Sequence, residues 1–282
     1  MRPLVVVGDV MVDHHLHVDP APADEKVRVL TRERQLGGTG ANVAAAMAAL
    51  GASPMLVAAV GDDADGEWLR TQLAERALRD DGIVVLPGRT GNATIIHRGE
   101  RREVLVDIGV ALDVPAPSLA GLDEPLVFAN FAPRVAVELV LRGDGPRTVV
   151  GFEAWMADVP GLLEALDGVV LVITNAAGGE ALDAAGRSPV APWVVTDGAR
   201  GVTIREPGEA PVRVPAVEVE ALDATGAGDC FAGVLVACLA EGVGLREAVE
   251  HAVRGAALST TVVGAQGLLP TREQVGLPPA RR

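Results

Sequence analysis

The sequence contains a single lysine, Lys26, and no tyrosine. Since Lys26 follows no glycine-rich loop, a GxxxxGK[ST] phosphate-binding loop and a strand lysine of the protein-kinase type are both excluded. Any phosphate that the protein handles must be neutralised by backbone amides, arginine or a metal ion. Aromatic residues make up only 2% of the chain, so valine, leucine and alanine must fill the core.

Cysteine, positive charge and long apolar runs are also scarce. Cys230 and Cys238 fall on one predicted helix, about 12 Å apart along its axis, which is too far for a disulfide. No Cys/His spacing resembles a zinc site, and no signal-peptide pattern opens the chain, so we expect a cytoplasmic protein. No run of 18 apolar residues predicts a membrane helix. A net charge of -14 argues against nucleic acid or an anionic membrane as partner.

The 282 residues suffice for one large α/β domain. Apolar runs alternate with amphipathic helical patterns, which is typical of parallel βαβ units that bind ligands at the carboxyl ends of their strands. The expected strands are Leu4–Val7, Pro54–Val60, Leu126–Phe131, Thr148–Phe152, Val169–Thr174 and Trp193–Thr196. Helices are expected at Asn42–Leu50, Gly66–Leu78, Val135–Arg142 and Val159–Leu166.

Two stretches, 14–36 and 92–107, break this pattern by alternating polar and apolar residues. We interpret them as a small antiparallel sheet that projects from the main sheet and acts as a lid over a ligand. The alternative is a plain surface hairpin. His14, His15 and His17 are expected on a surface strand of this sheet.

The run from Asp223 to Asp229 is rich in glycine and leads into the apolar stretch Phe231 to Leu239. A helix start presents unpaired N–H groups and a partial positive charge, which suits an anion such as a phosphate. Asp229 beside it could take a proton from an attacking hydroxyl. The alternative is an ordinary strand-to-helix turn with an aspartate near the helix start.

A second glycine-rich loop, Gly37 to Asn42, opens another predicted helix. Its glycines would allow a ligand to approach the backbone, and Asn42 offers a donor and an acceptor to sugar hydroxyls. Asp9 and Asp13 leave the carboxyl edge of the first strand, where Asp13 could accept hydrogen bonds from two vicinal hydroxyls. In the alternative, these polar residues only satisfy their own loops.

The order and spacing of these motifs resemble the ribokinase-like (PfkB-type) carbohydrate kinase family. The matching motifs are Gly8-Asp9-x-x-x-Asp13, Gly37-Gly38-x-Gly40-Ala41-Asn42, Val60-Gly61-Asp62-Asp63-x-x-Gly66, Thr196-x-Gly198-Ala199-Arg200-Gly201, Asp223-x-Thr225-Gly226-Ala227-Gly228-Asp229 and the ending Gly264-Ala265-Gln266 to Pro270-Thr271. The resemblance implies an α/β fold, a three-layer α/β/α sandwich with a mainly parallel central sheet and a small β-sheet lid. It implies a single domain over residues 1–282, with the lid at about 14–36 and 92–107.

The resemblance also implies roles for individual residues. Asp229 would be the catalytic base, beside an anion hole formed by the amides of Gly226, Ala227 and Gly228. The other implied residues are Asp13, Gly37, Gly38 and Asn42 for the sugar, Asn175, Thr196, Gly198 and Gly201 for ATP, and Asp223 and Thr225 for a monovalent cation such as K⁺. Mg²⁺ would arrive with ATP, without a protein ligand that we can assign.

The sequence departs from the family pattern in three places. The family's Asn-x-x-Glu motif has Gly178 at its last position here, and Glu180 falls two residues late. Thr39 stands where ribokinases frequently carry lysine. The segment Gly151 to Trp155 does not match the acidic-Asn-Arg pattern of fructokinase-like members, so the acceptor stays open.

The predicted function is ATP-dependent phosphorylation of a ribose-like pentose or a hexose, with Asp229 as base. Three alternatives stay open. A nucleoside kinase needs a seat for the base, and neither lid segment contains Phe, Tyr or Trp. A sugar-phosphate kinase needs cations, which Arg98, Arg101 and Arg102 could supply. The third is a non-catalytic sugar- or nucleotide-binding regulator. Exposed lid edges also suggest a homodimer.

Overall fold

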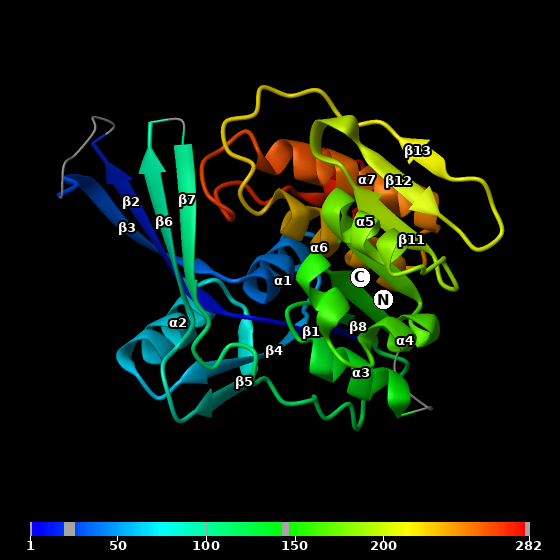
Figure 1. The fold of residues 1–282 in the computed structure, drawn as a ribbon, viewed down its shortest axis with the longest axis horizontal. Coiled ribbons are helices and arrows are strands. Elements are labelled where there is room, and N and C mark those ends of the chain that lie inside the picture. Colours follow the sequence, from blue (N-terminus) through cyan, green and yellow to red (C-terminus); the bar gives the residue numbers. More distant parts are fainter. Residues whose placement is uncertain (1, 20–25, 100, 143–146, 280–282) are drawn as a thin grey trace.

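The computed structural model describes residues 2–19, 26–99, 101–142 and 147–279, and it contains a large and a small sheet (Figure 1). In this part of the chain the large sheet has nine strands in the order β13-β12-β11-β10-β9-β8-β1-β4-β5. These strands are β1 (Leu4–Val7), β4 (Met55–Gly61), β5 (Arg79–Leu86), β8 (Leu126–Ala129), β9 (Arg147–Phe152), β10 (Leu171–Asn175), β11 (Trp193–Thr196), β12 (Val202–Arg205) and β13 (Val212–Val214).

In this sheet order, the seven strands β11, β10, β9, β8, β1, β4 and β5 are parallel, while β12 and β13 extend one edge in antiparallel fashion. Parallel strands covered on both faces are near-continuously apolar, as the fully buried sequence of β1 illustrates. The helices are α1 (Thr39–Ala49), α2 (Ala64–Glu75), α3 (Pro133–Leu141), α4 (Leu162–Ala165), α5 (Ala176–Ala184), α6 (Ala227–Ala240), α7 (Leu245–Ser259) and α8 (Arg272–Val275), with short 3₁₀ turns η1 (Ala154–Asp158), η2 (Leu166–Gly168) and η3 (Gly198–Arg200).

Two apolar cores lie on opposite faces of the large sheet. Leu4 and Val6 of β1 pack into the core that contains α1, α2, α6, α7 and α8. Val5 and Val7 point the other way, into the core that contains α3, α4 and α5. This alternation along one strand produces the predicted three-layer α/β/α sandwich.

All six predicted strands are present, and the differences from the sequence analysis are local. The strand β5 was not predicted because charged residues and Gly82 interrupt its apolar pattern. The helix expected at Val159–Leu166 is reduced to α4, because Pro160 and Gly161, with a left-handed φ of 77°, precede Leu162. Cys230 and Cys238 both lie on α6, buried and unpaired.

The small sheet has the order β3-β2-β6-β7 and forms the lid. Its strands are β2 (Met11–Val18), β3 (Val29–Gly37), β6 (Asn92–Arg98) and β7 (Arg101–Asp107). The outer pairs are antiparallel as expected, whereas the central pair, β2 and β6, is parallel. The reason is that both strands leave the body on the same side and run outward, where Figure 1 shows them beside α1 and α2.

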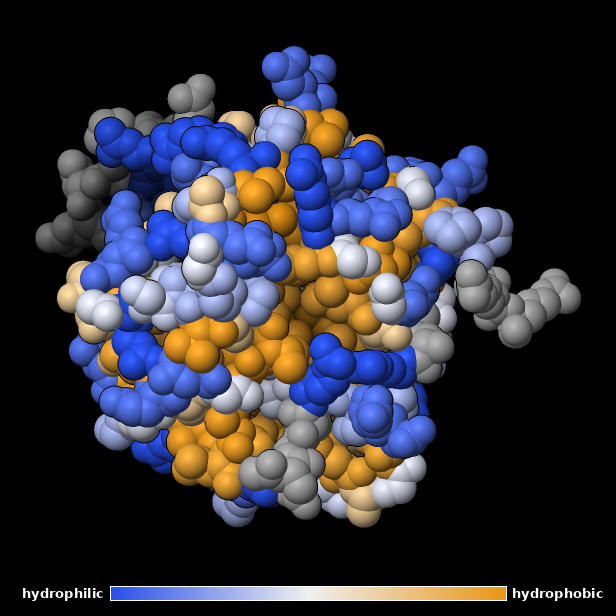
Figure 2. All heavy atoms as spheres, turned by 90° about the vertical axis from the view of Figure 1, so that its right-hand side faces the viewer, coloured by the Kyte–Doolittle hydropathy of each residue, from blue (hydrophilic) through white to orange (hydrophobic). Residues whose placement is uncertain are grey.

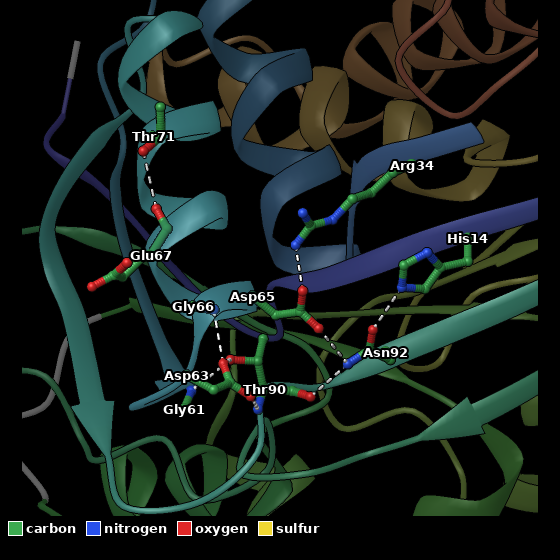
Figure 3. A network of polar contacts seen from close by, with 10 residues as sticks. All are labelled: His14, Arg34, Gly61, Asp63, Asp65, Gly66, Glu67, Thr71, Thr90 and Asn92. Atoms are coloured by element: carbon green, nitrogen blue, oxygen red, sulfur yellow. Dashed lines mark hydrogen bonds and ion pairs between the residues drawn. The ribbon is translucent and has the colours of Figure 1, made fainter. Parts of the chain in front are cut away.

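A polar network fixes the base of the lid to α2 (Figure 3). Asp63 caps α2 by accepting from the N–H of Gly66 at 2.9 Å, and it also accepts from the N–H and the hydroxyl of Thr90 at 2.9 and 2.5 Å. Asn92, the first residue of β6, donates to Asp65 of α2 and to the carbonyl of Thr90. Hydrogen bonds therefore hold the segment that enters β6.

The end of the molecule remote from the lid presents apolar side chains around a shallow hollow, with hydrophilic side chains scattered at its margin (Figure 2). Within the described residues no helix is both long and apolar enough to cross a bilayer.

Candidate active site

The candidate site forms where the carboxyl end of β1, the start of α1 and the start of α6 meet. Asp229, the third residue of α6, accepts a hydrogen bond of 2.8 Å from the side-chain amide of Asn42 on α1. The carbonyl oxygen of that amide accepts from Gln266 at 2.9 Å. Three segments far apart in the sequence thus fix the orientation of the Asp229 carboxylate.

The start of α6 offers free N–H donors. Gly226 is the N-cap with φ of 73°, and a Cβ there would come within 2.6 Å of Ala265, so the position requires glycine. Among the described residues, the N–H groups of Gly226, Gly228 and Asp229 have no acceptor, whereas that of Ala227 donates to Ala224 at 3.2 Å. The predicted anion hole therefore has two free glycine amides, with the third in a long turn bond.

Several carboxyl groups crowd the same place and change one another's protonation. Burial raises the pKa of Asp229 to about 7, and the charges of Asp9, Glu153 and Asp13 add to this effect against the hydrogen bond from Asn42. Burial and the charge of Asp9 raise the pKa of Asp13 to about 7, while Arg102 lowers it. Burial raises that of Asp9 to about 6, against backbone hydrogen bonds. Such values suit a carboxylate that exchanges protons near neutral pH.

The glycine-rich loop before α1 closes tightly over the first strand. A Cβ on Gly37 would fall 2.2 Å from the Asp13 carboxylate. Gly38 has φ of 92°, and a Cβ there would fall 2.7 Å from the carbonyl oxygen of Asp9. The structure therefore places Gly37 against Asp13 and Gly38 against Asp9, and the N–H of Asn42 donates to the carbonyl of Gly38 at 3.0 Å.

The carboxylate of Asp223 organises the loop before α6. One oxygen accepts from the N–H and the hydroxyl of Thr225, at 2.9 and 2.6 Å, and the other accepts from the N–H of Gly264 at 2.9 Å. Burial acts to raise the pKa of Asp223, but these hydrogen bonds and Arg102 hold it below its ordinary value. Arg102, which reaches over from the lid, donates to Thr225 at 2.6 Å and lies 4.0 Å from Asp223. Since the β6–β7 hairpin contacts this loop, it is more than a surface hairpin.

The residues predicted for ATP lie on neighbouring strand ends. Asn175 ends β10 and caps α5 through the N–H of Gly178, and Thr196 ends β11 directly opposite Asn175. Gly198 and Gly201, both with positive φ, bracket η3 immediately after β11. No hydrogen bond joins any of these four residues to Asp229 within the described structure.

Glu153 is a site residue that the sequence analysis missed. Its carboxylate accepts from the side-chain amide of Asn175 at 3.1 Å, and its pKa is raised by burial against that hydrogen bond. Glu180 is exposed on α5. The carboxylate beside Asn175 therefore comes from the end of β9, which neighbours β10 in the sheet but lies 22 residues away in the sequence.

The histidines of β2 differ from the expected surface strand. His15 is buried, and one imidazole of the pair His15 and His97 donates to the other across 3.0 Å. His17 also stacks on His97, with ring centres 4.4 Å apart. Only His14 points toward the base of the lid, where it contacts Asn92 (Figure 3). The register of β2 with β6 brings these rings together, and no sequence pattern reveals it.

An aromatic pair stands at the ends of β8 and β9. The rings of Phe131 and Trp155 are 5.7 Å apart, and Trp155 is 43% exposed. Phe131 has φ of 52°, which is a strained conformation for a bulky residue. Because Asn130 before it is buried against Gly8 and Gly151, the strain places the Phe131 ring at the carboxyl edge of the sheet.

In the described part of the chain, no group of three or more His, Cys, Asp and Glu side chains is arranged to hold a metal ion. The donors present are instead backbone amides, hydroxyls and single carboxylates.

A family model for pfkB family carbohydrate kinase matches residues 1–130 and 171–272. The chain is 30% identical to the ribokinase of Bacillus subtilis (strain 168) over 297 residues, a match that covers 98% of each chain. It is also 29% identical to the bifunctional protein HldE of Caulobacter sp. (strain K31), but that match spans only 62% of the relative's length.

Solved structures show the same fold. The ribokinase of Thermotoga maritima superposes with a TM-score of 0.82 at 23% identity and covers 98% of both chains. The nucleoside kinase of Methanocaldococcus jannaschii superposes with a TM-score of 0.84 at 18% identity, covering 98% of this chain and 97% of its own. With the motifs and the family match, these similarities identify the chain as a member of the pfkB family, an ATP-dependent carbohydrate kinase with a ribokinase-like fold.

Proposed function

We propose that the protein transfers the γ-phosphoryl group of ATP to a hydroxyl of a small sugar, with Asp229 as general base. The observation that carries this proposal is the start of α6, where a carboxylate with a pKa of about 7 adjoins two glycine amides that have no acceptor in the described chain. An acceptor hydroxyl placed beside Asp229 would lose its proton as it attacks phosphorus. The amides of Gly226 and Gly228 would stabilise the charge on the transferred group.

The acceptor would bind between the lid and α1. Asp13 would accept hydrogen bonds from two vicinal hydroxyls, and Asn42 would hold Asp229 in position while it meets the reacting hydroxyl. Gly37 leaves no room for a Cβ beside the Asp13 carboxylate, and Gly38 leaves none beside the Asp9 carbonyl, so the loop packs closely against the end of β1 and the start of β2. A ribose-like pentose or a hexose would suit this polar floor.

The nucleotide would bind along the ends of β10 and β11. Asn175 and Thr196 offer an amide and a hydroxyl there, and Gly198 and Gly201 give the backbone turn of η3. Mg²⁺, which supplies charge neutralisation to the phosphates, would bind mainly through them and through water. Glu153, which accepts a hydrogen bond from Asn175, lies at the same strand ends.

A monovalent cation such as K⁺ would bind at the turn of Asp223 and Thr225. The Asp223 carboxylate keeps lone pairs beyond the three hydrogen bonds that it accepts, and its lowered pKa keeps it ionised. A cation there would lie close to the first amides of α6.

The Asp229→Asn variant tests the mechanism. We expect acceptor-dependent ADP release to fall by a factor on the order of 10³ or more, while ATP affinity measured by calorimetry stays within about twofold. Near-full turnover would refute the role of Asp229 as base. A non-catalytic regulator would bind sugar or nucleotide, yet wild-type protein would release no ADP with any acceptor.

A nucleoside kinase is the second candidate, and the pair of Phe131 and Trp155 favours it. An exposed indole beside a strained phenylalanine at the carboxyl edge of the sheet could stack on a nucleobase. The lid segments offer no such aromatic side chain of Phe, Tyr or Trp. If inosine is the better acceptor, Trp155→Ala should raise its KM at least about tenfold and leave that of ribose unchanged. If ribose is preferred and Trp155→Ala changes nothing, this candidate is excluded.

A further inference from the structure

Four side chains that the proposed reaction does not use gather on one face of the lid. His15, His17, His97 and Arg102 form what we term the lid cluster. The rings of His15 and His97 are 5.3 Å apart and within 15° of parallel, and His17 stacks on the same His97 ring. The strand register places His97 directly opposite both His17 on β2 and Arg102 on β7.

The lid cluster lies on the same face of the small sheet as Asp13, which is proposed to bind the sugar. Asp13, His15 and His17 alternate along β2, so their side chains point the same way, and His15 follows Asp13 by about 7 Å along the strand. This face is turned toward the loop before α6, because Arg102 donates to Thr225. An acceptor held at Asp13 would therefore extend toward the lid cluster.

The contacts of this cluster within the described chain leave several of its N–H donors available. Arg102 is 41% exposed, and within the described chain only its bond to Thr225 engages the guanidinium as a donor. Burial, followed by the neighbouring imidazoles, lowers the pKa of His15 and of His97, so both rings are neutral near pH 7 and carry one N–H each. One of these N–H groups is used in the hydrogen bond between the two rings, which leaves one for a ligand. The carboxylates of Glu33 on β3 and Asp223 oppose this lowering.

The neighbouring arginines do not point to the same place. Arg98 and Arg101 pair with each other one step beyond His97 and Arg102, so their side chains belong to the other face of the sheet. Arg98 donates instead to the carbonyl of Asp19. Arg32 and Arg34 on β3 stand opposite Leu16 and His14, on the face away from Asp13. Among the arginines of the described lid strands, Arg102 alone shares a face with Asp13.

We propose that the phosphoryl acceptor carries an anionic substituent, a phosphate or a carboxylate, remote from the reacting hydroxyl, and that Arg102 binds it together with the remaining N–H of the His15–His97 pair. This inference rests on the proposed sugar kinase function and narrows its substrate class. The planar guanidinium fits either anion with two parallel hydrogen bonds, and one imidazole N–H adds a further donor.

Matched acceptors in an ADP-release assay test this proposal. The pairs are ribose with ribose 5-phosphate, glucose with glucose 6-phosphate, and glucose with gluconate. We expect one anionic member to exceed its neutral partner about 10- to 100-fold in kcat/KM, and the pair in which this occurs distinguishes phosphate from carboxylate. Arg102→Gln should remove this preference mainly through KM, whereas Arg101→Gln on the other face should keep it.

Two results would overturn the proposal. One is a higher kcat/KM for the neutral members. The other is an equal loss of kcat/KM for both members in Arg102→Gln, which would mean that Arg102 only holds the lid to Thr225.

If no acceptor is phosphorylated, the kinase function fails for these sugars, and a binding measurement then tests the anion site separately. With a non-hydrolysable ATP analogue bound, inorganic phosphate or acetate should shift the ring resonances of His15 and His97 saturably in wild type but not in Arg102→Gln. Unchanged resonances in wild type would refute the anion site.

Discussion

Replacing Asp229 with asparagine is expected to stabilise the folded protein above pH 5. Burial, aided by the charges of Asp9, Glu153 and Asp13, raises the pKa of Asp229 from 3.8 to about 7. An acid with a higher pKa in the folded state binds its proton more tightly there than in the unfolded chain. Its favourable contribution is complete below pH 3.8 and is lost as the pH rises through 7.

The size of the effect follows from this interval. Between pH 5 and pH 7, Asp229 is mainly protonated in the folded state and ionised in the unfolded state. The contribution of Asp229 to the free energy of unfolding therefore falls by at most about 1.4 kcal/mol per pH unit, or about 2.3 kcal/mol across the interval, because half of the folded molecules have lost the proton at pH 7. Asp229→Asn carries no such proton, so its advantage over wild type should grow by about that amount and level off near pH 8.

Urea unfolding followed by tryptophan fluorescence at pH 5, 6, 7 and 8 measures this advantage. Asp113→Asn is the matched control, because it makes the same change at an exposed aspartate. If the difference in free energy of unfolding between Asp229→Asn and wild type is constant over the four pH values, burial does not raise the pKa of Asp229.

Four further predictions concern the rate, the lid and assembly. Because the proposed base must be ionised, kcat/KM should rise with pH through about 7 and then level off; a flat profile from pH 5 to 9 would contradict it. Asp63→Ala removes the hydrogen-bond acceptor for Gly66 and Thr90 and should lower the free energy of unfolding, measured in urea, by about 2–4 kcal/mol. A loss under about 1 kcal/mol would mean that the polar network at the base of the lid contributes little to stability. Replacing K⁺ by tetramethylammonium should lower kcat in wild type and leave Asp223→Asn unaffected; equal responses would exclude a cation at this turn. Light scattering should give a dimer joined through the lid, whose edge strand β7 exposes 60% of Leu105, and a monomer would exclude this pairing.

Much of the fold could be predicted because its signals are local. Buried parallel strands such as Leu4–Val7 are short apolar runs, and the helices between them show in the spacing of apolar residues. The strand β5 escaped because Asp80, Asp81 and Gly82 hide its pattern. The parallel pairing of β2 with β6 depends on where these two strands leave the large sheet, and no single segment of the sequence encodes that position.

The site residues that lie in sequence motifs could be predicted, whereas those that meet only because two strands are neighbours in a sheet could not. Asp229 and Asn42 lie in glycine-rich loops, and their hydrogen bond joins two motifs that the sequence analysis had singled out. Glu153 reaches Asn175 only because β9 and β10 are neighbours. Arg102 differs from Arg101 solely by the face of β7 that it occupies, which follows from the register of the hairpin.

The position of the lid and the charge of the acceptor site are physically coupled. Burial and Asp9 raise the pKa of Asp13, whereas the positive charge of Arg102 lowers it, and Thr225 holds Arg102 at that place. In the proposed site, an ionised Asp13 would accept hydrogen bonds from two sugar hydroxyls, whereas a protonated Asp13 would offer one acceptor fewer. A lid position that brings Arg102 close would therefore favour the ionised Asp13, and a sugar bound to the ionised form would favour that lid position by the same free energy.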